Sequence, residues 1–140
     1  MALIYVVDDA ADYRFLIGRF LKHSLPEHTF AFFDDGASLC QETIESAHEQ
    51  ATRPDLVLMD IHMPGRNGIQ TLICLKQVSG WNQIPVIMLS SSSDPAEIDA
   101  CYQAGAQSVV NKATDWQAFT RHIQQLLAGE SRETRQAGGA

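Results

Sequence analysis

The sequence has little cysteine, little positive charge and no long apolar run. Its 140 residues include three cysteines, ten lysines and arginines, and seventeen aspartates and glutamates. Cys40, Cys74 and Cys101 are far apart and form no C-x-x-C pair. We therefore expect them to be small buried apolar side chains, and we expect neither a zinc site nor a disulfide framework.

The charge and the short apolar runs exclude several classes of partner. A net charge of −7 repels phosphate backbones, so nucleic acid is not expected as a direct partner. The longest nearly uninterrupted apolar run, residues 84–89, is far shorter than the ~20 residues of a membrane-spanning helix. No basic stretch precedes the apolar residues at the N-terminus, so we expect no signal peptide, no membrane association and a cytoplasmic location.

Short apolar runs alternate with amphipathic stretches five times along the chain. Most of the short runs are apolar on consecutive residues, which is typical of strands buried on both faces of a parallel sheet. The order predicts an α/β fold, a (βα)5 doubly wound parallel five-stranded sheet, with no residues left for a second domain. The expected strands are residues 3–7, 29–33, 55–59, 85–89 and 108–111.

Two acidic segments have the composition of helix starts. Asp94 precedes Pro95 and stands three residues before Glu97, the arrangement of an N-cap with a capping box. The segment Asp34-Asp35-Gly36 follows the expected edge strand, and we interpret it as a turn and helix cap.

Polar residues stand at the carboxyl ends of four expected strands. Asp8 and Asp9 follow the first, Asp60 the third, Ser90 the fourth and Lys112 the fifth. Ligands of open α/β sheets bind at this edge. Three adjacent carboxylates repel one another, and a divalent cation together with one ammonium would compensate them. A carboxylate left over can act as a nucleophile towards phosphorus.

These residues carry a strong resemblance to a known family. Ser90 follows Asp60 by 30 positions and Lys112 follows it by 52, and the surrounding motifs are VVDD at 6–9, LMDIHMPGRNG at 58–68, PVIMLSS at 85–91 and GA at 105–106. The chain resembles, over about residues 2–128, the receiver domain of bacterial two-component response regulators, of the single-domain, chemotaxis-regulator-like type. The resemblance implies a flavodoxin-like strand order of 2-1-3-4-5, a receiver domain at 1–128 and a flexible tail at 129–140.

The resemblance also assigns roles to the site residues. Asp60 would be the phosphoacceptor that attacks a phosphohistidine. Mg²⁺ would be bound by Asp9, by Asp60 and by the backbone carbonyl of His62, with Asp8 acting mainly through metal-bound water. Lys112 would pair with the acceptor and then with the phosphoryl group.

Further expectations concern switching and partners. Ser90 would move inwards to hydrogen-bond the phosphoryl group, while His62 and Ser92 lie at positions that tune the attacking water in the family. The partner would be a sensor histidine kinase or a histidine phosphotransfer protein. The face formed by the fourth helix, fifth strand and fifth helix, which includes Tyr102 and Trp116, would be the surface for a homodimer. The chain would perform only its own phosphorylation and dephosphorylation and would not be an enzyme.

Three positions depart from the usual pattern of the family. Ser90 replaces a frequent threonine but keeps the hydroxyl. Val109 occupies the place of an aromatic switch residue, so we expect output to depend on movement of the loop after the fourth strand and on the surface of the fifth strand and helix. Ala113 replaces a proline that is usually cis, which leaves either a strained bond or a reorganised loop. The alanine and the long stretch at 36–53 resemble partners of phytochrome-type kinases.

Three alternative functions remain to be weighed. A degenerate receiver could act as a scaffold independently of phosphorylation, an alternative that Val109 and Ala113 favour. A phosphatase of the haloacid-dehalogenase type would need a second aspartate two residues after Asp60, where the chain has His62. A flavodoxin-like cofactor binder would need a phosphate-binding loop after the first strand, where the chain has two aspartates.

Overall fold

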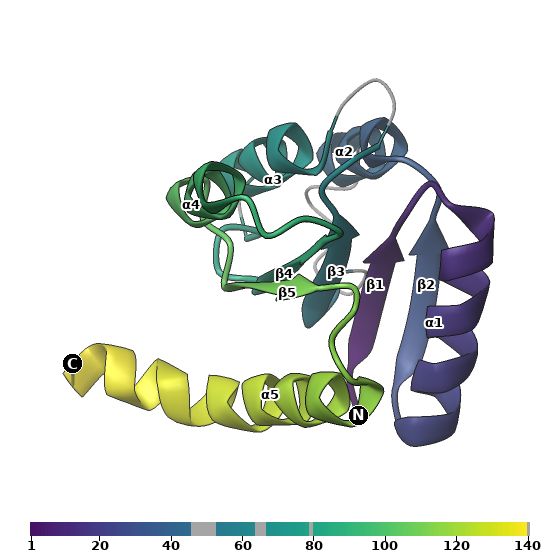
Figure 1. The fold of residues 1–140 in the computed structure, drawn as a ribbon. Helices are drawn as coiled ribbons and strands as arrows, with labels where there is room; N and C mark the ends of the chain where they lie inside the picture. Colours follow the sequence, from purple (N-terminus) through teal and green to yellow (C-terminus); the bar gives the residue numbers. More distant parts are fainter. Residues whose placement is uncertain (46–52, 64–66, 79, 140) are drawn as a thin grey trace.

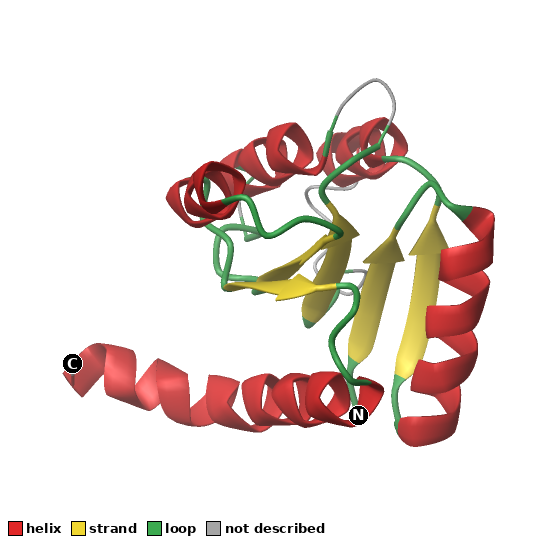
Figure 2. Cartoon of the chain, viewed as in Figure 1, coloured by secondary structure: helices red, strands yellow, loops and turns green. Residues whose placement is uncertain are grey.

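The computed structural model describes residues 1–45, 53–63, 67–78 and 80–139. Strands and helices alternate along the described chain, as Figures 1 and 2 show. The elements, in chain order, are β1 (Leu3–Val7), α1 (Ala11–Ser24), β2 (Thr29–Phe33), α2 (Gly36–Glu45), β3 (Leu56–Asp60), α3 (Gly68–Gln77), β4 (Val86–Ser90), α4 (Pro95–Gln103), β5 (Ser108–Asn111) and α5 (Trp116–Gly139).

The strands form one parallel sheet in the order β2-β1-β3-β4-β5. This order confirms the predicted doubly wound α/β fold. The strand order reverses between β1 and β3, and at such a reversal the connections leave in opposite directions and open a crevice at the carboxyl edge. The fold therefore places the ends of β1 and β3 side by side at the position expected for a ligand.

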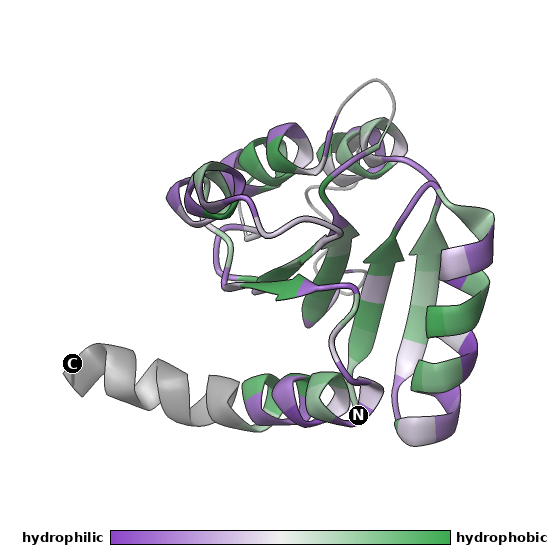
Figure 3. Ribbon diagram, viewed as in Figure 1, coloured by the Kyte–Doolittle hydropathy of each residue, from purple (hydrophilic) through white to green (hydrophobic). Residues whose placement is uncertain are grey.

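The three inner strands, β1, β3 and β4, are buried on both faces, which explains their nearly continuous apolar sequence, whereas the edge strands β2 and β5 are partly buried. Alternate residues point to opposite faces, so Val57 and Met59 pack under α2, α3 and α4, whereas Leu56 and Leu58 pack under α1 and α5. Figure 3 shows the apolar strands between helices that carry polar residues on their outer sides.

Two strands end one residue later than the sequence predicts. Asp60 pairs with Leu89 and Ser90 pairs with Asn111, so both polar residues are the last members of their strands. Pairing with a neighbouring strand extends the ladder past the end of the apolar run. The polar side chains therefore start from regular strand backbone and not from a loop.

Gly68 allows the start of α3 to lie against the end of β3. A Cβ atom at this position would meet the Asp60 carbonyl oxygen at 2.2 Å and the Ile61 Cα at 2.9 Å, both closer than real Cβ contacts. The Gly68 N–H donates to the Ile61 carbonyl at 2.7 Å. Any side chain here would push α3 away from the carboxyl edge of the sheet.

The predicted helix caps are confirmed in part. The Ser38 N–H donates to the Asp35 carboxylate at 2.6 Å, and the Ala96 N–H donates to the Asp94 carboxylate at 3.1 Å. The capping box predicted for Asp94 does not form, because its backbone N–H donates to the Ser92 hydroxyl at 3.1 Å. Glu97 is thereby free for other contacts.

The prediction for the cysteines is wrong for two of the three. Cys101 is buried and free, as expected, but Cys40 and Cys74 form a disulfide that joins α2 to α3. Their Cα atoms are 6.4 Å apart, within the usual reach of such a bond. The pairing depends on how two helices pack and has no local spacing motif, so it could not be predicted from the sequence.

The helix α5 continues to Gly139, so the predicted tail at 129–140 has helical backbone as far as the structure describes it. In Figure 1 the later turns of α5 extend away from the sheet. The flexibility of this segment stays a prediction. Within the described residues, no helix has both the length and the apolar character needed to cross a membrane.

Reduction of the Cys40–Cys74 disulfide should lower the free energy of unfolding by about 3–4 kcal/mol, because the bond closes a loop with a sequence separation of 34. Urea unfolding followed by circular dichroism, with and without dithiothreitol, measures the difference. A double variant, Cys40→Ala with Cys74→Ala, should be insensitive to the reductant. Equal midpoints for reduced and oxidised wild-type protein would contradict this prediction.

Candidate functional site

Every site residue that the sequence predicts lies at the carboxyl edge of the sheet. Asp8 and Asp9 follow β1, Asp60 ends β3, Ser90 ends β4 and Lys112 follows β5. Part of the motif after β3, residues 64–66, lies outside the described residues. The strand order brings together side chains that are up to 104 positions apart in the sequence.

The three aspartates form one acidic cluster. Each offers a carboxylate oxygen, and these oxygens lie within 4.8 Å of one another. Asp8 is fully buried and Asp60 is 4% exposed, whereas Asp9 is exposed to solvent. The Asp8 carboxylate also accepts a hydrogen bond from the Ala10 N–H at 2.8 Å, which fixes its orientation.

Lys112 joins the two buried carboxylates. Its Nζ atom lies 3.0 Å from the Asp8 Oδ2 and 3.2 Å from the Asp60 Oδ1. The lysine side chain is 19% exposed, so this pairing has little screening by water. One ammonium group thus links the ends of β1 and β3 to the loop after β5.

Burial and neighbouring charges raise the pKa values of two groups at the site. Burial and the neighbouring Asp8 carboxylate raise the pKa of Asp60, although Lys112 opposes this shift. Burial by itself would lower the pKa of Lys112, but the hydrogen bond to Asp8 and the charges of Asp60 and Asp8 outweigh it and raise that pKa. Burial is the largest cause of the raised pKa of Asp60 and the Asp8 charge adds to it, and the Lys112 ammonium offsets the two only in part.

Ser90 uses its hydroxyl within its own loop. The hydroxyl donates to the Ser92 carbonyl at 2.6 Å and accepts from the Ser92 N–H at 3.0 Å. It also lies 3.4 Å from the Glu97 carboxylate. Ser90 as a whole is 1% exposed, and these hydrogen bonds hold its buried hydroxyl in a defined orientation.

Glu97 is a site residue that the sequence analysis missed. Its carboxylate lies 2.7 Å from the His62 Nε2 and touches the Ser90 hydroxyl, so it links the loops after β3 and β4. The sequence suggested only a capping role. No local pattern distinguishes the two roles, because the difference depends on which way the first turn of α4 faces.

Tyr13 is the second residue that the sequence analysis missed. It lies on the first turn of α1, and the Lys112 Nζ lies 4.4 Å from the centre of its ring. Burial and the charges of Asp8 and Asp60 raise the pKa of Tyr13 to about 12. Its place four residues after Asp9, on the helix that begins at the site, is the signal that could have found it.

The loop after β5 bears on the third departure from the family pattern, Ala113 in place of proline. The peptide bond between Lys112 and Ala113 is trans. Asn111 instead organises a turn, in which its side chain accepts from the Ala113 N–H at 2.8 Å and its carbonyl from the Thr114 N–H at 2.9 Å. Of the two arrangements expected at Ala113, a strained cis bond and a reorganised loop, the structure has the reorganised loop.

Val109 supplies no ring to the face between α4 and β5. Its side chain packs against the core cluster under α2, α3 and α4, and its N–H donates to the Tyr102 hydroxyl at 3.2 Å. Tyr102 itself is 48% exposed and comes from α4. The aromatic side chain near this position is therefore Tyr102 of α4, and β5 contributes none.

The donor set of the cluster fits Mg²⁺. This ion prefers one or two carboxylates with several waters, and Asp9 and Asp60 provide one exposed and one buried carboxylate beside the already paired Asp8. The positive charge of the ion would also offset the negative charge that remains, because the single Lys112 ammonium faces three carboxylates. The exposed side of Asp9 leaves room for coordinated water.

Curated relatives of this chain include proteins of bacteria and of rice. Response regulator Rcp1 of Synechocystis sp. PCC 6803 is 27% identical over 123 residues, which cover 87% of this chain and 83% of the relative. Protein PilH of Pseudomonas aeruginosa is 29% identical over 130 residues, 92% of this chain and 100% of PilH. The sensory/regulatory protein RpfC of Xanthomonas campestris is 45% identical over 60 residues, and the match spans only 8% of RpfC.

Solved structures share the fold. The phosphorylated cyanobacterial phytochrome response regulator RcpA matches with a TM-score of 0.76 at 23% identity, over 91% of this chain and 94% of that one. The receiver domain of the sensor histidine kinase PA1611 from Pseudomonas aeruginosa, solved with magnesium in its active-site cleft, matches with a TM-score of 0.77 at 21% identity, over 91% and 98%.

The family match covers the whole sheet and the site. Residues 4–124 match the family described as the response regulator receiver domain. The matched range includes the acidic cluster, Ser90 and Lys112. The matches to Rcp1 and PilH extend over most or all of those two proteins. The chain belongs to the response regulator receiver domain family.

Proposed function

We propose that this chain works as a stand-alone receiver that accepts a phosphoryl group on Asp60 and changes its surface in response. The observation that carries the proposal is the Asp60 carboxylate, which lies between the Lys112 ammonium and the acidic cluster. Receiver domains are phosphoacceptors as a family. The share of PilH and Rcp1 that the chain matches supports a single-domain protein.

The phosphoryl donor in this proposal is a phosphohistidine on a sensor histidine kinase or a histidine phosphotransfer protein. An Asp60 oxygen attacks phosphorus, a P–O bond forms, the P–N bond breaks, and the imidazole nitrogen keeps the electron pair. The likeness to the phytochrome response regulators supports a phytochrome-type kinase as the partner. Release into water returns the carboxylate and inorganic phosphate, so the protein acts on itself alone and is not an enzyme. We place the chain in the cytoplasm.

The side chains of Asp9 and Asp60 and the carbonyl of His62 would hold Mg²⁺, with Asp8 acting through coordinated water. The bound ion supplies charge neutralisation at the phosphoryl oxygens. Lys112 neutralises the remaining oxygen charge, since its ammonium already lies 3.2 Å from the acceptor carboxylate.

Ser90 is the residue that must change partners. Its hydroxyl donates to Ser92 in the structure, so it has to rotate before it can donate to a phosphoryl oxygen. Glu97 stabilises the outward arrangement through its contacts with Ser90 and His62. Movement of the loop after β4, together with the surface of β5 and α5, would then carry the signal, and the face of α4, β5 and α5 would form the homodimer.

Incubation with Mg²⁺ and acetyl phosphate should add one phosphoryl group to the wild-type protein, measured by intact mass. Asp60→Asn should take up none, because its amide is not a nucleophile. Beryllofluoride, a stable phosphoryl mimic, covers the case of rapid hydrolysis. The absence of an adduct and of beryllofluoride binding in wild-type protein would contradict the proposal and favour the scaffold that needs no phosphorylation.

Asp9→Asn should weaken Mg²⁺ binding at least tenfold, since it removes one of the two carboxylates that the ion contacts, and each tenfold step corresponds to about 1.4 kcal/mol. Isothermal titration calorimetry with MgCl₂ measures the dissociation constant. Asp12→Asn is the matched control, because Asp12 is an exposed carboxylate on the first turn of α1 and should bind as wild type does. Equal losses in both variants would indicate a general charge effect.

Glu97→Gln should tighten beryllofluoride binding by roughly threefold to tenfold, because it removes a negative charge near the anion and weakens the contact that holds Ser90 outward. Asp99→Asn makes the same charge change on the exposed side of α4 and should leave the affinity unchanged. Fluorescence titration gives both constants. Unchanged or weaker binding in Glu97→Gln would show that Glu97 does not restrain the switch.

A further inference from the structure

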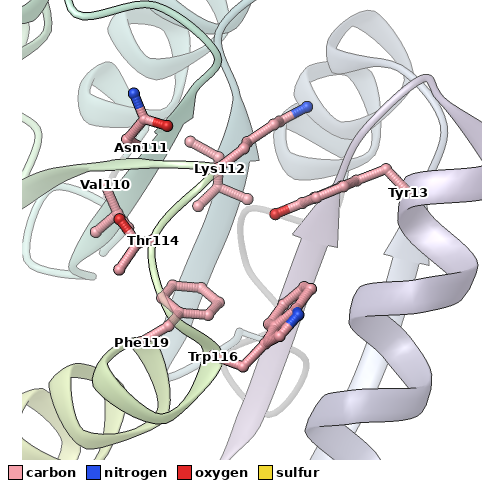
Figure 4. Close-up of a pocket in the computed structure, with 8 residues that line it drawn as sticks. Tyr13, Val110, Asn111, Lys112, Thr114, Trp116 and Phe119 are labelled. Atoms are coloured by element: carbon pink, nitrogen blue, oxygen red, sulfur yellow. The ribbon is translucent and has the colours of Figure 1, made fainter.

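Tyr13 and Lys112 meet beside the acidic cluster although they come from opposite ends of the domain. The Lys112 Nζ lies 4.4 Å from the centre of the Tyr13 ring, a distance at which a cation is attracted to the electron-rich face. Figure 4 shows both side chains on the edge of one small hollow, together with Trp116 and Phe119. The ring therefore faces the same ammonium that pairs with the two buried carboxylates.

The ring is itself held in place by other aromatic side chains. Trp116 stacks with Tyr13 at 6.4 Å between ring centroids and an angle of 25°. Trp116 in turn contacts Phe20 at 4.7 Å and Phe119 at 6.3 Å. These rings belong to the packing between α1 and α5, so the position of Tyr13 is fixed by the core beneath it.

The other two contacts of Lys112 have to change during phosphorylation. The Asp60 oxygens would become part of an acyl phosphate, and Asp8 would turn to coordinated water. A lysine side chain has four rotatable carbon–carbon bonds and loses its orientation when its charged partners leave. The Tyr13 ring takes no part in the bonds that form or break. Of the three contacts of Lys112, with Asp8, Asp60 and Tyr13, only the contact with Tyr13 therefore stays the same throughout.

We propose that Tyr13 is a positioning residue, whose ring holds the Lys112 ammonium at the acceptor while the carboxylate contacts are exchanged. This inference rests on the proposed function, since it concerns the phosphoryl transfer to Asp60. The ring carries the effect, and the phenol hydroxyl is not required.

The test compares Tyr13→Phe, which keeps the ring, with Tyr13→Leu, which keeps an apolar side chain without a ring. The rate constant for phosphorylation is measured at saturating acetyl phosphate with Mg²⁺. We expect Tyr13→Phe to remain within twofold of wild type and Tyr13→Leu to fall about tenfold, the size of a partly desolvated cation–π contact. The Mg²⁺ dissociation constant should stay within twofold in both variants, which separates positioning from loss of the site.

A merely structural role is excluded by repeating the substitution in a Lys112→Ala background. With no ammonium to position, Tyr13→Leu should cause no further loss of rate, whereas a packing defect would lower the rate again. A second readout does not depend on phosphorylation. The ε-methylene protons of Lys112 should show an upfield ring-current shift that Tyr13→Phe keeps and Tyr13→Leu loses.

The outcomes separate the two proposals. Wild-type protein that forms no Asp60 adduct overturns the proposed function and this inference with it. An adduct that forms at the same rate in Tyr13→Leu overturns the inference alone, as does an equal loss in the Lys112→Ala background or a Lys112 resonance without a ring-current shift. A tenfold loss that Tyr13→Phe rescues and Lys112→Ala abolishes supports it.

Discussion

The pairing of one ammonium with two buried carboxylates is the interaction on which the site depends. Asp8 is fully buried and Asp60 almost so, and a carboxylate removed from water keeps its charge only when a partner compensates it. Lys112 supplies that partner at 3.0 and 3.2 Å. Because the three residues come from the ends of β1 and β3 and from the loop after β5, their contact requires the strand order and register of the whole sheet.

The other polar groups around this pair are already satisfied by partners outside it. Ser90 bonds within its own loop, and His62 pairs with Glu97. A buried hydroxyl that leaves its partners needs another of similar strength, so under the proposed function Ser90 would exchange its bonds in the loop for one to the phosphoryl group. Under the proposed function, with Val109 in place of an aromatic residue, the coupling to the surface would come from this exchange in the loop after β4 and from the surface of β5 and α5.

The sequence predicted the fold well because the core pattern is redundant. Each strand carries several consecutive apolar residues, so one misjudged position does not hide it, and only the ends of β3 and β4 differ by a residue. The helix starts were predicted where one local hydrogen bond decides, as at Asp35 and Asp94. The prediction failed at the Cys40–Cys74 disulfide, which depends on how two helices pack, and at the capping box of Asp94, whose backbone N–H donates to the Ser92 hydroxyl instead.

The residues of the candidate site also differ in how well the sequence predicts them. Asp8, Asp60 and Lys112 could be predicted because strand ends bring them together whatever the helices do. Glu97 and Tyr13 reach the site from helices, where a rotation of 100° per residue decides whether a side chain faces the cluster or the solvent. That rotation is set by the contacts of each helix: the ring of Trp116 on α5 packs against Tyr13 and Phe20 of α1, and the turn at Ser92 precedes α4. Strand ends thus supply the charged groups of the site, and the packing of helices decides which further side chains hold them in position.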